Sequence, residues 1–98
     1  MTNEILHIKS IIETFYDVSI KPLHRYQRLF FPESEAVDMF IYITLKDKIA
    51  RKKDLSELLG MTYRNVEIRY NKEIRMIKTN KYLSKNYQEI KKLLPQTV

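Results

Sequence analysis

An all-α fold is predicted for this 98-residue chain by three features of its sequence. The chain has one glycine and three prolines, too few for the many tight turns of a sheet protein. Its apolar residues recur three and four positions apart, the repeat of a helix that buries one face. Its length suits one modest core. We therefore expect a single domain over residues 1–98 with five to six helices.

The first half of the chain is expected to contain two long helices and a short one. The first helix carries apolar residues at helical spacing, namely Ile5, Ile8, Ile12 and Phe15. Thr2 or Asn3 can cap its start. Ser19 is placed to cap a short second helix through Pro22 and Leu23. A basic and aromatic loop, Arg25 to Phe31, is expected to follow this helix. A third helix is predicted from Pro32–Ser34 to about Ala50, with Glu33 and Glu35 in its first turn.

The second half predicts a short helix, a glycine turn and two further helices. The segment Lys53 to Leu59 ends at Gly60, the sole glycine, which is the expected left-handed cap. Thr62 can cap the next helix, whose apolar positions are Tyr63, Val66, Tyr70, Ile74 and Ile77. A final helix runs from about Lys81 to Leu94, and Pro95 stops it.

A helix, a glycine turn and a capped helix over about residues 53–78 form the pattern of a helix-turn-helix. The second helix of that motif enters the major groove of DNA. Ser56 is small where the two helices approach each other, and the contact positions are apolar: Leu55, Leu59, Met61 and Val66. The alternative interpretation of this pattern is an ordinary helical hairpin.

The charge of the chain is concentrated in its second half. Eighteen Lys and Arg against twelve Asp and Glu give a net charge of +6. Residues 1–49 carry 6 basic and 7 acidic side chains, whereas residues 50–98 carry 12 and 5. A basic half beside a nearly neutral half is typical of a protein that binds a polyanion, most commonly nucleic acid. The alternative is a solvated, lysine-rich surface.

The predicted site is therefore a double-stranded DNA surface. Arg can bond guanine, Asn can bond adenine, and an Ile can contact a thymine methyl group. The predicted base-reading residues are Tyr63, Arg64, Asn65, Ile68 and Arg69. The predicted phosphate contacts are Arg51, Lys52, Lys53, Thr62, Lys72 and Arg75. Tyr63 can instead pack under the turn, and Glu67 is expected to pair with Arg64 or Asn71.

Other functional classes find little support in the sequence. There is no cysteine, His7 and His24 are isolated, and no glycine-rich phosphate loop is present. The acidic residues Glu33, Glu35 and Asp38 lie at a predicted helix start, where the helix dipole favours negative charge. We expect no catalytic site, no metal and no cofactor. The chain has no apolar run of membrane-spanning length and no basic amino-terminal segment, so we expect neither membrane contact nor a signal peptide, and a cytoplasmic, nucleoid location.

Nearly the whole chain resembles a known family in its order of helices, and two stretches are the most similar. Phe15-Tyr16-Asp17-Val18-Ser19, followed by Leu23, and the final Ile90-Lys91-Lys92-Leu93-Leu94 are similar to the carboxy-terminal DNA-binding domain of the replication initiator DnaA. That resemblance implies a Trp-repressor-like helical fold and duplex DNA binding without the initiator's ATPase part. Family members carry Gly-Arg-Asp-His-Ser/Thr-Thr-Val where this chain has Gly60-Met61-Thr62-Tyr63-Arg64-Asn65-Val66, so only the first and last positions match.

Three alternatives stay open at this point. The segment Asp54 to Thr62, with Val66 and Arg69, is also similar to the helix-turn-helix of cyclic-AMP-receptor-type transcription regulators. A protein-interaction module that keeps the scaffold without reading DNA is the rival function, with a homodimer or another protein as partner. Single-stranded RNA binding would use the seven tyrosines for stacking, but Tyr16, Tyr70 and Tyr87 are expected in the core.

Overall fold

The structure, a computed structural model, describes residues 3–24 and 27–94, which fold into five α-helices without a strand. The helices are α1 (Asn3–Tyr16), α2 (Glu33–Lys46), α3 (Lys52–Leu59), α4 (Tyr63–Thr79) and α5 (Lys81–Leu93). The predicted all-α fold is thus confirmed, with five helices in the described part of the chain. None of these helices is both long enough and apolar enough to cross a membrane.

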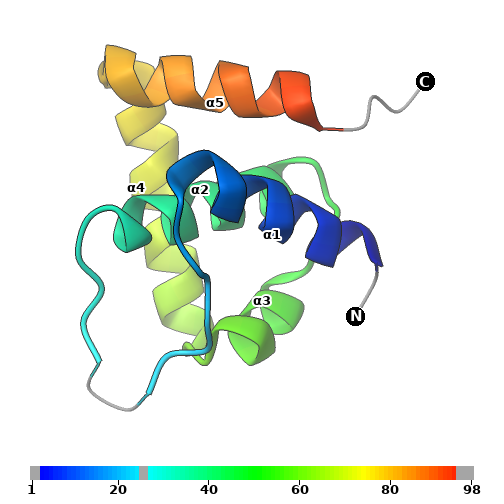
Figure 1. Ribbon diagram of the computed structural model, residues 1–98. Helices are drawn as coiled ribbons and strands as arrows, with labels where there is room; N and C mark the ends of the chain where they lie inside the picture. The colour runs from blue at the N-terminus through cyan, green and yellow to red at the C-terminus, as the bar shows by residue number, and fades with distance from the viewer. Residues whose placement is uncertain (1–2, 25–26, 95–98) are drawn as a thin grey trace.

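The helices are arranged around α2. Figure 1 shows α5 across one end of the molecule and α3 at the other, with α4 running between these two ends. α1 packs on α2, and α2 in turn packs on α4, so α2 lies between two neighbours. After α1, residues 17–24 descend to the level of α3, and residues 27–32 lead back to the start of α2 (Figure 1).

α2 is the centre of the core because it is buried all round from Ala36 to Thr44. A helix without a polar face is stable only when other elements cover it. The Thr44 hydroxyl group donates a hydrogen bond to the carbonyl oxygen of Phe40 at 2.7 Å, which satisfies it inside the core. The other helices contribute buried side chains that include Ile5, Ile8 and Ile12 of α1, Leu55 and Leu59 of α3, Val66 of α4 and Ile90 of α5.

α2 ends at Lys46, so the predicted end near Ala50 is wrong. Lys48 adopts a left-handed backbone conformation, with φ of 57°, and the chain turns there. The backbone N–H groups of Ile49 and Ala50 both donate to the carbonyl oxygen of Thr44, at 2.9 and 3.1 Å. This turn satisfies helix-end carbonyls and buries Ala50 against the core, which a straight continuation of the helix would not do.

The predicted short helix from Ser19 through Pro22 and Leu23 is absent, and this prediction is wrong. The backbone of this segment bonds to distant partners instead of to itself. The Glu13 carboxylate accepts a hydrogen bond from the backbone N–H of Ile20 at 2.6 Å. The N–H of Leu23 donates to the carbonyl oxygen of Leu59, at the end of α3, at 2.9 Å. These bonds fasten the segment to α1 and α3 in a non-helical conformation.

The other helix boundaries agree with the predictions within one or two residues. The predicted loop after Leu23 is also confirmed for residues 27–30, which carry no helix. Thr2, Arg25, Tyr26 and Pro95 lie outside the described residues. Tyr16, Tyr70 and Tyr87 pack against the core as predicted.

Candidate nucleic-acid interface

The turn between α3 and α4 depends on Gly60 for two reasons. Its φ of 65° lies in the left-handed region, where a side chain is unfavourable. A Cβ atom at this position would also lie 2.9 Å from the carbonyl oxygen of Leu23. Ser56 closes the turn, because its hydroxyl group donates to the carbonyl oxygen of Met61. The predicted glycine cap is confirmed, and it also seats the segment between α1 and α2.

Thr62 starts α4 as predicted. Its hydroxyl oxygen accepts a hydrogen bond from the backbone N–H of Asn65 at 3.1 Å. The four apolar residues predicted to join the two helices are all buried, namely Leu55, Leu59, Met61 and Val66. α4 is thus held to the protein by one face, and the direction of its other face is fixed.

The exposed face near the start of α4 carries most of the predicted base-reading residues. Arg64 and Asn65 are exposed. Ile68 has 53% of its surface accessible, and Tyr63 has 54%. This exposure leaves part of the Tyr63 ring accessible for stacking. Ile68 is thus an exposed apolar side chain between polar neighbours on this face.

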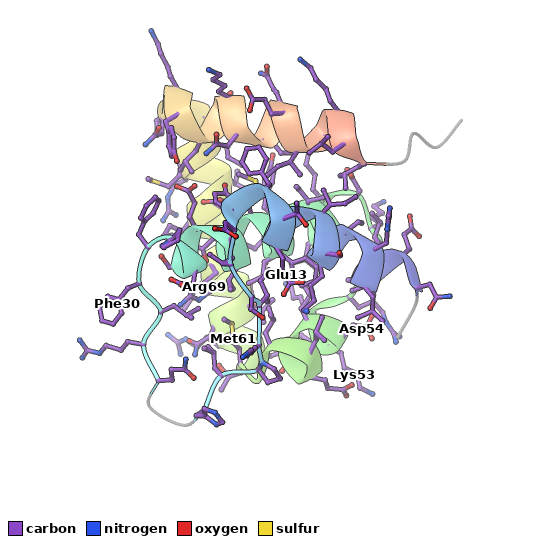
Figure 2. The ribbon with its side chains drawn as sticks, viewed as in Figure 1. Glu13, Phe30, Lys53, Asp54, Met61 and Arg69 are labelled. Atoms are coloured by element: carbon purple, nitrogen blue, oxygen red, sulfur yellow. The ribbon has the colours of Figure 1, made fainter. Side chains whose placement is uncertain are left out.

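Arg69 and Lys72 differ from these residues, because the structure pairs both with Asp38 of α2. The Arg69 guanidinium nitrogen Nη1 lies 2.7 Å from Asp38 Oδ1. The Lys72 amino group lies 3.0 Å from Asp38 Oδ2. The Asp38 side chain is only 5% exposed. Arg69 lies between α4 and the segment that returns to α2 (Figure 2). Both cations are therefore paired with a buried carboxylate of the neighbouring helix.

The basic run Arg51 to Lys53, at the start of α3, has three different environments. Arg51 pairs with Asp54, which accepts a hydrogen bond from the Arg51 backbone N–H at 3.0 Å. That bond, together with the guanidinium group, lowers the pKa of Asp54. Lys52 lies 3.6 Å from Glu67 and links α3 to α4, so the expected partners of Glu67, Arg64 and Asn71, are not the ones observed.

Lys53 is exposed and has no ion pair within residues 3–24 and 27–94. It lies at the α3 end of the molecule (Figure 2). Arg75, further along α4, is also exposed. Three of the six predicted phosphate contacts each have an acidic partner, namely Arg51, Lys52 and Lys72. The other three are exposed, and the two cations among them have no ion pair in the described part of the chain: Lys53, Arg75 and the uncharged Thr62.

A groove of about 340 Å³ runs beside the exposed face of α4. One side consists of Leu23 and Gln27, and the other of α4 residues that include Asn65, Ile68 and Lys72. The sequence did not predict the groove, because the segment that forms its first side was expected to be partly helical. The pairing of Asp38 with Arg69 and Lys72 was not predicted from the sequence. An acid within an apolar run could have indicated this, because a buried carboxylate needs cationic partners.

The described residues contain no cluster of three His, Asp or Glu side chains that could hold a metal ion. Comparison with models of protein families, with curated proteins and with solved structures finds no match to this chain.

Proposed function

We propose that this chain is a non-enzymatic protein that binds duplex DNA, with α4 as a recognition helix in the major groove. The observation that carries the proposal is the exposed face of α4, on which Arg64, Asn65 and Ile68 project from a helix anchored by its opposite face. A helix that follows a tight turn and presents its first turns to solvent is how helix-turn-helix proteins reach base edges.

Each exposed side chain suits a particular base contact. Arg64 can donate two hydrogen bonds to guanine, and Asn65 can bond the edge of adenine. Ile68 suits the methyl group of thymine, which explains an apolar side chain in this position. Tyr63 can stack on a sugar beside the turn. The proposal assigns sequence reading to these residues and does not require Arg69, which Asp38 holds.

The phosphate contacts are assigned to exposed groups on both sides of the turn. Lys53 lies at the start of α3, and Arg75 lies eleven residues beyond Arg64, about 16 Å along the axis of α4 at 1.5 Å per residue. The amino-terminal end of α4 adds its helix dipole and the Thr62 hydroxyl group. Contacts of this kind orient a protein on DNA without reading its sequence.

The biological role that fits best is a replication-initiator-like or transcription-regulator-like protein of the cytoplasm and nucleoid. The resemblances to DnaA and to cyclic-AMP-receptor-type regulators support this proposal. The residues with which the initiator family reads its origin boxes are replaced here, so we propose a different preferred DNA sequence.

Selection from randomised duplexes, followed by measurement of Arg64→Ala on the selected site, tests the proposal. Loss of a bidentate guanine contact should weaken binding to that site by about 1–3 kcal/mol and relax one base position. Lys53→Ala is the matched control, since both side chains are exposed and cationic. It should weaken selected and random duplexes alike. Equal losses on both duplexes for Arg64→Ala would overturn its assigned role.

A second candidate function is a protein-interaction module, and one observation favours it. Phe30 and Phe31 are among the most exposed apolar side chains described, and Phe30 points outward from the segment that precedes α2 (Figure 2). Neighbouring exposed aromatic residues often mark protein contacts. No detectable DNA binding by the wild-type chain at low salt would favour this function, with a second copy or another protein as the partner.

A further inference from the structure

Asp38 is the least accessible carboxylate that is paired with cations in the described structure. It belongs to the buried stretch of α2, between Val37 and Met39. A carboxylate in such a position stays charged only when opposite charges compensate for the loss of water. Arg69 and Lys72 supply them, with Arg69 Nη1 at 2.7 Å and Lys72 Nζ at 3.0 Å. One buried acid therefore holds two cations of α4.

These two cations lie next to the proposed DNA surface. Arg69 and Lys72 line the groove beside Asn65 and Ile68. Lys72 retains 48% of its side-chain surface, so its amino group is not enclosed. It can bond a phosphate only by leaving Asp38 or by sharing its charge with it. The acid thus competes with DNA for the cations closest to the base-reading face.

We propose that Asp38 is a positioning residue that restrains Arg69 and Lys72 and thereby limits the sequence-independent attraction of this face for DNA phosphates. This inference rests on the proposed function. Non-specific affinity grows with each phosphate that a cation neutralises, because each neutralised phosphate releases a counterion. A cation held in an ion pair with a carboxylate contributes little to this term, because it is not in contact with a phosphate. Restraint of two cations leaves a larger share of the binding energy to base contacts.

The first test compares Lys72→Gln with Lys53→Gln on a random-sequence duplex, at several salt concentrations. The slope of log affinity against log salt changes by about 0.9 for each phosphate that the protein neutralises. Lys53→Gln should reduce the slope by about this amount, because Lys53 is exposed and has no ion pair within the described residues. Lys72→Gln should leave the slope unchanged. Both lysines have exposed side chains, so neither variant removes core packing.

The second test compares Asp38→Asn with Asp47→Asn. Each variant raises the net charge by the same amount, but Asp47 pairs with Lys91 of α5 and does not contact α4 cations in the described ion pairs. Asp38→Asn should steepen the salt slope by about 0.9 for each released cation that neutralises a phosphate. Its affinity for random duplex should rise more than its affinity for the preferred site. Asp47→Asn should reproduce neither change.

The outcomes separate the inference from the function on which it rests. A decrease in slope for Lys72→Gln equal to that for Lys53→Gln, or identical behaviour of Asp38→Asn and Asp47→Asn, overturns the restraint while DNA binding stands. Absence of binding by the wild-type chain at low salt overturns the proposed function and the restraint together. If Asp38→Asn melts below the assay temperature, the two lysine variants decide the question.

Discussion

Gly60 couples two parts of the molecule that are far apart in the sequence. Its backbone conformation ends α3, and its missing side chain leaves room for the carbonyl oxygen of Leu23. The adjacent Leu59 carbonyl oxygen accepts the N–H of the same leucine. A single residue therefore determines both the turn before α4 and one side of the groove.

Gly60→Ala should lower the free energy of unfolding by about 1–3 kcal/mol, because it adds left-handed strain and a Cβ contact with backbone. Chemical denaturation measures this loss. Lys48→Ala is the control, since Lys48 already has a left-handed φ with a side chain, and its replacement should change stability by less than about 0.5 kcal/mol. A Gly60→Ala variant as stable as the wild type would show that the turn does not require a glycine.

At the scale of single residues, the sequence predicts local roles better than distant ones. The roles of Gly60 and Thr62 follow from positions within four residues, and both are confirmed. The partner of Arg69 is Asp38, 31 positions away, and its identity depends on how α2 packs against α4. Spacing along the chain carries no information about that packing.

Among the helices, a partly buried polar cluster joins four elements: Tyr16 of α1, Glu35 of α2, Glu73 of α4 and Asn86 of α5. The Asn86 amide donates to Glu35 at 3.4 Å. Glu73 is 2% exposed, and its Oε2 atom has no hydrogen-bond partner in the described structure. Burial raises the pKa of Glu73 to about 7, with further upward contributions from Asp38 and Glu35 against the opposing charge of Lys72.

Glu73 should therefore make the fold less stable as pH rises. The folded state holds the Glu73 proton more tightly than the unfolded chain, whose pKa is near 4.5. The contribution is complete below pH 4.5 and disappears as pH approaches 7. Relative to Glu73→Gln, the wild-type free energy of unfolding should fall by about 3 kcal/mol across this window.

Urea denaturation at a series of pH values measures this difference. Other carboxyl groups titrate in both proteins, so the difference between them isolates Glu73. Glu89→Gln provides the control, because Glu89 is exposed, and it should follow the wild-type profile. A Glu73→Gln profile parallel to that of the wild type would mean that the carboxyl group titrates normally in the folded state.

The helices themselves were predictable where apolar spacing and caps agree. α4 follows Thr62, whose side chain caps the helix as predicted, and α5 begins at Lys81 as predicted. The segment around Ser19 was not predictable, because Glu13 and Leu59, from two different helices, take its backbone hydrogen bonds. The early end of α2 has a similar cause, since burial of Ala50 depends on the tertiary fold.

Over the whole molecule, the fold divides the positive charge of the second half between two ends. α3 and the start of α4 lie at one end, and α5 lies at the other (Figure 1). The exposed lysines of α5, namely Lys81, Lys85 and Lys92, are thus separated from Lys53 and Arg64. Screening at about 0.1 M salt limits charge interactions to roughly 10 Å. The sequence located the excess charge in one half of the chain, but only the fold identifies which part surrounds α4.

Mapping of backbone amide chemical shifts during titration of the wild-type chain with a short DNA duplex shows whether α4 is the DNA-binding surface. Binding through α4 predicts changes concentrated at Thr62 to Ile68 and at Arg51 to Lys53, with the outer face of α5 unchanged. The changes should diminish as salt is added, because phosphate contacts release counterions. No change at low salt, or changes centred on α5, would contradict the proposal that this chain binds DNA through α4.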